Sequence, residues 1–340
     1  MRIAITADPF IPVPPENYGG IERVIDFLVN GLNAKGHDVL LVAHAESTTK
    51  ANILRYKTQG HGWRDHVSNI RTIAQLGRFK PDIIHSFSRL TYLLPFLYSR
   101  VPKLMSYQRE PTVGQIKKGV QIARKNTLAF TGCSDYITSK ISRYARCTTV
   151  YNGVELDKYR FSARVASDAP LMFLGRLEPI KGIKNAVDVA IAAGRKLIIA
   201  GTIPAEYADY FEQEIRPAFN TDIEYIGPVN DAKKNELLGQ SAALLMPIEW
   251  NEPFGIVMAE ALACGTPVIG FNRGSVPEVI LHGKNGFRCD TMEEMVTLVK
   301  QTDKISRQDV RRDAEARFSD RVIVDEYLEV YQNSIRALQN

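Results

Sequence analysis

Short apolar segments alternate with amphipathic helical segments along both halves of this 340-residue chain. Such alternation predicts parallel β-sheets wound with helices. In the first half the expected strands are 2–7, 38–43, 82–85, 103–106, 127–131 and 148–151. In the second half they are 171–175, 196–200, 223–226, 243–246 and 267–270. The sequence therefore predicts an α/β fold with two doubly wound, Rossmann-like domains in series.

Length also favours two domains, because 340 residues exceed the size at which a single core stops growing. Residues 152–170 are polar and small and contain no clear long helix, so the linker is expected there. We place the N-terminal domain at 1–160 and the C-terminal domain at 161–320. The last segment, 321–338, has apolar residues at helical spacing and is expected to form a helix.

The composition, with 45% hydrophobic residues, indicates a globular protein. No stretch approaches the roughly 18 apolar residues of a membrane span, and the N-terminus is too quickly charged for a signal peptide, so we expect a cytoplasmic location. The four cysteines form no C-x2-C pair, which argues against a zinc site or a disulfide framework.

Charge is divided unevenly along the chain. Residues 1–165 contain 24 Lys and Arg against 12 Asp and Glu, while residues 166–340 contain 19 against 26. The densest basic run comprises Arg109, Lys117, Lys118, Arg124, Lys125, Lys140, Arg143 and Arg146. A basic first half suits an anionic acceptor or peripheral contact with the inner face of an anionic membrane, and it equally suits a solvated face that aids solubility. No nucleic-acid-binding module accompanies the charge.

Two carboxylates eight residues apart, Glu252 and Glu260, enclose a Pro-Phe-Gly turn. The apolar spacing after this turn predicts a helix, which Gly265-Thr-Pro267 ends. Glu252 would precede the helix, Glu260 would lie about two turns along it, and the N–H groups of the first turn would lie between them. This cradle suits a nucleotide-diphosphate sugar, with one carboxylate on the sugar, the helix N-terminus on phosphate and the other carboxylate on the ribose. The expected contacts around the turn are Pro253, Phe254, Gly255 and Ile256.

A second motif, Gly175-Arg-Leu-Glu-Pro-Ile-Lys-Gly182, follows one expected strand and precedes a helix. Arg176 and Lys181 could clamp a diphosphate, although an Arg and a Lys five residues apart are common on protein surfaces. In the first half, the paired glycines of Tyr18-Gly19-Gly20 open a helix, where they permit close approach to an oxyanion or form an ordinary turn. His85 ends a strand, a position in which a lone histidine is more often structural than catalytic.

Together, the Glu-x7-Glu motif and the sequence Ala-Cys-Gly-Thr-Pro-Val-Ile that follows it closely resemble the signature of the retaining glycosyltransferases of family 4, or glycosyl transferases group 1. The resemblance implies the GT-B fold, in which two domains face across a cleft and the C-terminal helix, here 321–340, crosses back to the first domain. It implies that Arg176 and Lys181 bind the donor diphosphate and that Gly20, beside Gly19, reaches the phosphate. It also implies that His85 lies near the transferred sugar and that the backbone of Gly227 and Val229 holds the nucleobase.

The resemblance thus assigns catalysis to His85, Arg176, Lys181 and Glu252, with the departing phosphate accepting the acceptor proton. No Asp-x-Asp motif occurs, so no metal or other cofactor is expected. The loop 106–111 departs from the family, because many relatives carry a histidine there, and the acceptor remains unidentified: a glycan, a lipid carrier or a small metabolite. Two other functions stay open, a nucleotide-sugar epimerase of the same architecture and a non-catalytic nucleotide-sugar-binding subunit.

Overall fold

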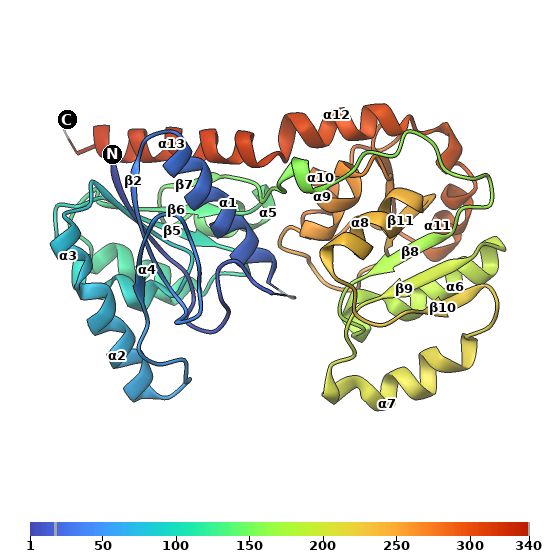
Figure 1. Ribbon diagram of the computed structural model, residues 1–340, viewed down its shortest axis with the longest axis horizontal. Helices are drawn as coiled ribbons and strands as arrows, with labels where there is room; N and C mark the ends of the chain where they lie inside the picture. The colour runs from blue at the N-terminus through green and yellow to red at the C-terminus, as the bar shows by residue number, and fades with distance from the viewer. Residues whose placement is uncertain (17–18, 339–340) are drawn as a thin grey trace. The chain divides into compact units, whose positions relative to one another are not determined.

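The computed structural model describes residues 1–16 and 19–338, and the chain forms two compact units (Figure 1). Unit 1 comprises Met1–Gly153 and Asp320–Asn340, and unit 2 comprises Val154–Ser319. The chain leaves unit 1 after Gly153, inside the polar stretch in which the sequence predicts the linker and a few residues before the expected boundary at 160.

Unit 1 contains a seven-stranded parallel sheet in the order β3-β2-β1-β4-β5-β6-β7. Its strands are β1 (Arg2–Thr6), β2 (Asp38–Ala43), β3 (Asn52–Arg55), β4 (Ile83–Ser86), β5 (Lys103–Tyr107), β6 (Leu128–Gly132) and β7 (Cys147–Thr149). Its helices are α1 (Gly20–Ala34), α2 (Trp63–Ala74), α3 (Leu76–Phe79), the 3-10 helix η1 (Leu90–Phe96), α4 (Val113–Ile122), α5 (Asp135–Ile141) and α13 (Asp320–Arg336).

The two faces of this sheet carry different helices. The connection from β1 to β2 runs toward one edge, while the connections from β3 to β4 and onward to β7 run toward the other. Because parallel crossovers are right-handed, α1 covers one face, and α2, α3, η1, α4 and α5 cover the opposite face. The C-terminal helix α13 packs against α1, so it joins the first face.

Close packing and a surface ion pair attach α13 to unit 1. A methyl group at Gly31 of α1 would lie only 2.6 Å from Val324 Cγ2, so the glycine lets the two helices approach closely. Lys35 Nζ lies 2.8 Å from Asp325 Oδ1 at the surface. The expectation that the last helix joins the N-terminal domain is therefore confirmed.

Unit 2 contains a six-stranded parallel sheet in the order β10-β9-β8-β11-β12-β13. Its strands are β8 (Leu171–Leu174), β9 (Leu197–Ala200), β10 (Ile223–Tyr225), β11 (Ala243–Met246), β12 (Val268–Phe271) and β13 (Gly286–Cys289). Its helices include the 3-10 turn η3 (Pro179–Lys181), α6 (Ile183–Ala193), α7 (Ala208–Tyr210), α8 (Asp231–Gln240), α9 (Ile256–Ala263), α10 (Val276–Val279), α11 (Met292–Val299) and α12 (Arg307–Arg317). Helix α11 packs against α6, and α12 packs against α9.

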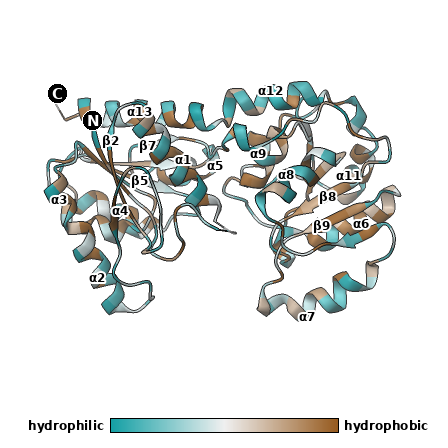
Figure 2. Cartoon of the chain, viewed as in Figure 1, coloured by the Kyte–Doolittle hydropathy of each residue, from teal (hydrophilic) through white to brown (hydrophobic). Residues whose placement is uncertain are grey.

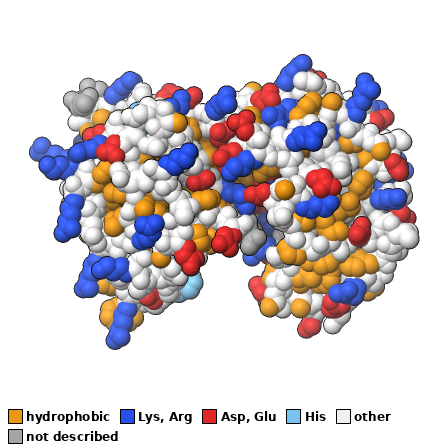
Figure 3. Space-filling model, in the orientation of Figure 1, with side chains coloured by type: hydrophobic (Ala, Val, Ile, Leu, Met, Phe, Trp, Pro, Cys, Tyr) orange, Lys and Arg blue, Asp and Glu red, His pale blue; other side chains and the backbone are white. Residues whose placement is uncertain are grey.

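The core of each unit lies between its sheet and its helices. The strands and α6 of unit 2 are mostly hydrophobic, whereas the solvated helix α12 is mostly hydrophilic (Figure 2). Charged side chains of both signs lie over the visible surface (Figure 3). Within residues 1–16 and 19–338, no helix is both long enough and apolar enough to cross a bilayer.

Strands β3 and β13 were not expected from the sequence. Each is four residues long and lies at an edge of its sheet, and all four residues of β3 are at least partly exposed. Strand β3 is partly exposed along its whole length, whereas β13 is mostly buried but has Gly286 and Arg288 among its four residues, so neither strand forms the continuous apolar run that marks a central strand.

Candidate active site

In unit 2, the predicted donor residues lie where the strand order reverses. Strands β8 and β11 are neighbours, and the chain proceeds from β8 toward one edge of the sheet and from β11 toward the other. Arg176 follows β8, and the segment Glu249–Gly255 follows β11. Open parallel sheets bind ligands beyond the carboxyl ends of strands at such a point.

Lys181 and Glu252 form the centre of this arrangement. Lys181 Nζ lies 2.7 Å from Glu252 Oε2, and Trp250 Nε1 donates to the same oxygen at 3.0 Å. The Lys181 ammonium also lies 4.6 Å from the centroid of the Trp250 ring. The carboxylate is only 8% exposed, so it is held in a partly dehydrated site beside a cation, where electrostatic interactions are stronger than in bulk water.

Two glycines bring the backbone close enough to form this site. Gly182 has φ of 74°, and a Cβ there would lie 1.8 Å from Pro247 O. Gly274 has φ of 57°, and a Cβ there would lie 2.3 Å from Glu252 O. Both positions therefore require glycine. The contact at Gly274 lets Ser275 N–H donate to Glu252 O at 2.9 Å, which fixes the backbone that carries the carboxylate.

Helix α9 begins after the Pro-Phe-Gly turn, as predicted. Gly255 caps it with φ of 74°, and the helix runs from Ile256 to Ala263. The Phe254 side chain is 2% exposed and packs against Phe318, so only the backbone of Phe254 can face a ligand. The N–H groups that begin an α-helix lack intrahelical acceptors, which gives this end of α9 the capacity to bind an anion.

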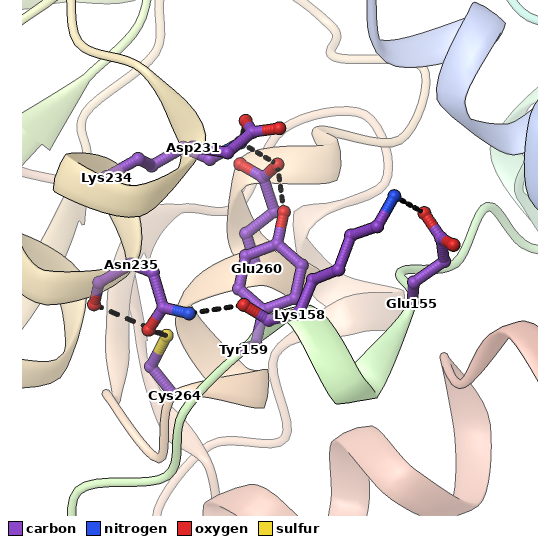
Figure 4. A network of polar contacts seen from close by, with 8 residues as sticks. All are labelled: Glu155, Lys158, Tyr159, Asp231, Lys234, Asn235, Glu260 and Cys264. Atoms are coloured by element: carbon purple, nitrogen blue, oxygen red, sulfur yellow. Dashed lines mark hydrogen bonds and ion pairs between the residues drawn. The ribbon is translucent and has the colours of Figure 1, made fainter. Parts of the chain in front are cut away.

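Glu260 is buried in a polar cluster in the same unit (Figure 4). Tyr159 Oη donates to Glu260 Oε1 at 2.7 Å, and Lys234 Nζ lies 2.5 Å from the same oxygen. Lys234 also pairs with Asp231 at 3.2 Å. The carboxylate is 6% exposed, so Lys234 supplies the positive charge that offsets its burial.

The other predicted donor residues lie near the same edge of the sheet. Arg176 is partly exposed, and its Nε lies 2.5 Å from Glu178 Oε1. Gly227 and Val229 follow β10, and Gly227 O accepts from Gly201 N–H at 3.0 Å after the neighbouring strand β9. The predicted donor residues outside the Lys181–Glu252 pair thus all follow strands: Arg176, Gly227 and Val229. The pair in direct contact is Lys181 and Glu252.

Unit 1 has a second polar cluster where its own strand order reverses, between β1 and β4. Ser88 Oγ donates to Asp8 Oδ1 at 2.7 Å, and Arg109 lies 3.6 Å from Asp8 Oδ2. Glu22, in the first turn of α1, is 7% exposed. Gly19 caps α1, and a Cβ there would lie 2.9 Å from Glu22 Oε2.

Gly20 is the first residue of α1, as the sequence predicts. Tyr18, which precedes the two glycines, lies outside the described residues.

Burial raises the pKa of Glu22 to about 7, and Asp8 adds to this effect. Because the folded-state pKa lies above the unfolded value of 4.5, protonated Glu22 favours the folded state. This contribution to the free energy of unfolding is fully present below pH 4.5 and is lost as the pH rises through 7. The stability advantage of Glu22→Gln over the wild type should therefore grow as the pH rises from 5 to 8 and reach about 3 kcal/mol near pH 8. Denaturant unfolding of both proteins at several pH values measures this difference, and a difference that does not change with pH would contradict the assignment.

His85 does not occupy a catalytic position, which corrects the prediction from the sequence. It lies within β4 and is fully buried, with Nδ1 2.6 Å from Tyr331 Oη of α13 and Nε2 2.6 Å from Ser106 Oγ. Burial lowers its pKa to about 3, so the ring is neutral at physiological pH. The strand continues through Ser86, and His85 therefore faces the core beneath α13 instead of standing at a strand end.

Several residues of these clusters were not predicted. Trp250, Tyr159 and Lys234 contact the predicted glutamates, but nothing in their sequence context distinguishes them from packing or surface residues. Asp8 could have been noticed because it follows the first strand, and Glu22 because it follows the Gly-Gly pair.

Comparison with known proteins yields two adjacent family matches. Residues 18–158 match the model of Glycosyltransferase Family 4, and residues 157–321 match that of Glycosyl transferases group 1. Glycogen synthase from Mycobacterium tuberculosis is 24% identical over 81% of this chain and 80% of its own length. Spore coat protein SA from Bacillus subtilis is 24% identical over 98% of this chain and 100% of its own length.

Solved structures share the fold. A glycosyltransferase from Rickettsia africae has a TM-score of 0.81 at 17% identity and covers 98% of both chains. The Anabaena protein HepE, in complex with UDP-glucose, has a TM-score of 0.75 at 17% identity over 98% of this chain and 100% of its own. With the two family matches together spanning residues 18–321, and with two Rossmann-like parallel-sheet units, the chain belongs to the group 1 glycosyltransferases of GT-B fold.

Proposed function

We propose that the protein transfers a sugar from a nucleoside-diphosphate sugar to an acceptor, with retention at the anomeric carbon and without a metal ion. The observation that carries this proposal is the Lys181–Glu252 pair at the point where the strand order of unit 2 reverses. The pair combines a cation for phosphate with a carboxylate for sugar hydroxyls. The UDP-glucose complex of the similarly folded HepE supports a donor of this class.

The proposed donor contacts follow from the positions of the side chains. Arg176, Lys181 and the N–H groups at the start of α9 would neutralise the diphosphate. Glu252 would accept hydrogen bonds from the sugar, and Glu260 from the ribose diol. Backbone groups at Gly227 and Val229 would hold the nucleobase.

In the proposed reaction, the bond between the anomeric carbon and the leaving phosphate oxygen breaks as the acceptor oxygen bonds to that carbon. The acceptor proton passes to the leaving phosphate, so the products are the glycosylated acceptor and a nucleoside diphosphate. Charge that develops on the phosphate is stabilised by Lys181 and Arg176. Since His85 is buried, no role in this step falls to it. The proposed acceptor is a glycan, a lipid carrier or a small metabolite.

A donor panel tests this proposal. Purified protein is mixed with UDP-, GDP-, ADP- and TDP-sugars, and thermal stabilisation is followed together with release of the nucleoside diphosphate, with and without EDTA. One donor should raise the melting temperature, since a ligand that binds only the folded state stabilises it by about 2.7 kcal/mol at a hundredfold excess over Kd.

The same donor should be hydrolysed slowly, and EDTA should change neither result. Lys184→Ala, which removes a neighbouring surface cation paired with Asp188, is the control and should behave as the wild type. Stabilisation by no donor in the panel, or release that requires a metal, would contradict the corresponding part of the proposal.

A further inference from the structure

The segments on one face of the unit 1 sheet carry all of that unit's excess positive charge. We call the segments 63–80, 89–100, 113–125 and 135–144 the basic face; they contain α2, α3, η1, α4 and α5. Together they hold 12 Lys and Arg against two Asp. The rest of unit 1 holds 11 Lys and Arg against 12 Asp and Glu, so the remainder of the unit is close to neutral.

These segments form one continuous surface. Helix α2 packs against η1, η1 packs against α4, and α4 packs against α5. All four helices lie on the side of the sheet opposite α1 and α13, as the right-handed crossovers require. Figure 3 shows Lys and Arg side chains interspersed with hydrophobic ones over the region where Figure 1 places α2, α3 and α4.

The positive charges of the basic face point to solvent. All 12 basic residues are exposed: Arg64, Arg71, Arg78, Lys80, Arg89, Arg100, Lys117, Lys118, Arg124, Lys125, Lys140 and Arg143. Within the described part of the chain, only Lys140 among them has an acidic partner, Glu110 at 3.9 Å. The two acids of the surface are engaged locally, because Asp65 accepts from Gly62 N–H at 3.1 Å and Asp135 accepts from Thr149 Oγ1 at 2.5 Å. A cationic surface with so few internal counter-ions is complementary to an anionic partner.

Apolar side chains are exposed on the same surface. Every large hydrophobic residue of unit 1 that is exposed in the described structure belongs to the basic face: Trp63, Val67, Leu94, Tyr98, Val120, Ile122 and Tyr144. Trp63 is 72% exposed and Tyr98 is 76% exposed, although burial of either ring would be favourable. Aromatic and aliphatic side chains among Lys and Arg are typical of elements that insert shallowly into a bilayer interface.

We propose that the basic face docks the protein on an anionic membrane surface. The charge would be attracted to acidic lipid headgroups, and the exposed Trp, Tyr and aliphatic side chains would enter the headgroup region. The exposed Val, Leu and Ile side chains favour a bilayer over nucleic acid, because they offer a base neither a stacking surface nor a hydrogen bond. All residues of the basic face belong to unit 1 and none of them is a proposed donor contact, so the inference does not depend on the proposed reaction.

Vesicle flotation tests the inference on the full-length protein. Vesicles of phosphatidylcholine alone are compared with vesicles that contain about 30% phosphatidylglycerol, whose charge the basic face would sense. The comparison is made at about 0.05 M and about 0.5 M salt, because screening shortens the range of the attraction. The wild type should float with the anionic vesicles at low salt, bind much less at high salt, and not bind neutral vesicles.

Three double variants separate the contributions. Lys118→Glu with Lys125→Glu should lower the partition coefficient on anionic vesicles by at least about tenfold. Trp63→Ser with Tyr98→Ser should lower it as well and should remove the binding that persists at high salt. Lys196→Glu with Lys284→Glu makes the same change of charge at exposed positions of unit 2 and should stay within about twofold of the wild type, because neither lysine belongs to the basic face.

A wild-type circular dichroism spectrum and a wild-type melting temperature show that each variant is folded. Absence of binding to anionic vesicles, or an equal loss in the unit 2 control, would overturn the inference. Binding to a single-stranded oligonucleotide but not to vesicles would overturn it too and would point to nucleic acid. Failure of the donor panel would leave these results unaffected, so the two proposals can fail separately.

Discussion

Replacing Lys181 by alanine is expected to lower kcat/KM by about 100- to 1000-fold, which is the usual effect of removing one group that stabilises charge in a transition state. Lys181 Nζ lies 2.7 Å from Glu252 Oε2, the carboxylate that we propose holds the sugar. Its loss removes charge from the diphosphate site and also leaves the carboxylate of Glu252, 8% exposed, without its cation. Both consequences reduce turnover.

The double variant Lys181→Ala with Glu252→Gln separates these effects. If the two side chains act as one unit, the double variant should be little worse than the poorer single variant, because residues in contact are not additive. Steady-state kinetics with the preferred donor compare Lys181→Ala, Glu252→Gln and the double variant. Lys184→Ala, on the adjoining helix, is the matched control. A folded Lys181→Ala protein with wild-type kcat/KM would remove Lys181 from the site.

Glu260→Ala is expected to reduce both donor affinity and stability. Loss of a charged hydrogen bond to the ribose should weaken donor binding by about 1.5–3 kcal/mol. The same substitution leaves Lys234 paired with the more exposed Asp231, 3.2 Å away, and removes the acceptor of Tyr159 Oη. Since breaking a buried ion pair strands a charge, the free energy of unfolding should fall by about 3 kcal/mol.

A donor analogue that lacks the ribose 2′-hydroxyl distinguishes the ribose contact from a general loss of structure. The wild type should bind the 2′-deoxy donor more weakly than the parent, whereas Glu260→Ala should bind the two equally. Tyr159→Phe, which removes one hydrogen bond and keeps the ion pair, should cost about 1 kcal/mol of stability and preserve the discrimination. Isothermal titration measures these affinities, and discrimination that survives in folded Glu260→Ala would contradict the ribose role.

The sequence predicted the architecture well because the central strands are strongly apolar and the helices between them are amphipathic. Two sheets and the helix after the Pro-Phe-Gly turn lie where the pattern places them. The edge strands β3 and β13 were missed because each is only four residues long and polar residues or glycine interrupt its apolar residues. The pairing of α13 with unit 1 was expected from family resemblance and not from periodicity, which indicates a helix but not its partner.

The site residues could be predicted where a motif places a charged residue beside a glycine turn. Site residues that lie outside such motifs were harder to predict. Lys181 and Glu252 are 71 positions apart, and their contact depends on β8 and β11 being neighbours, which spacing alone does not reveal. Lys234 and Tyr159 come from segments without a motif, so their convergence on Glu260 became visible only in the structure (Figure 4). The sequence placed His85 at the end of its strand, whereas β4 continues through Ser86. The apolar pattern does not fix a strand boundary to within one residue, so it could not distinguish the two positions.

The measurement that tests the central claim most directly is a crystal structure of the protein with the nucleoside-diphosphate sugar that the panel selects. The account predicts diphosphate oxygens within hydrogen-bonding distance of Arg176 and Lys181, the sugar against Glu252, and the ribose hydroxyls on Glu260. A donor bound away from the edge of the unit 2 sheet where β8 and β11 end, or one whose ribose and diphosphate contact none of these side chains, would contradict it.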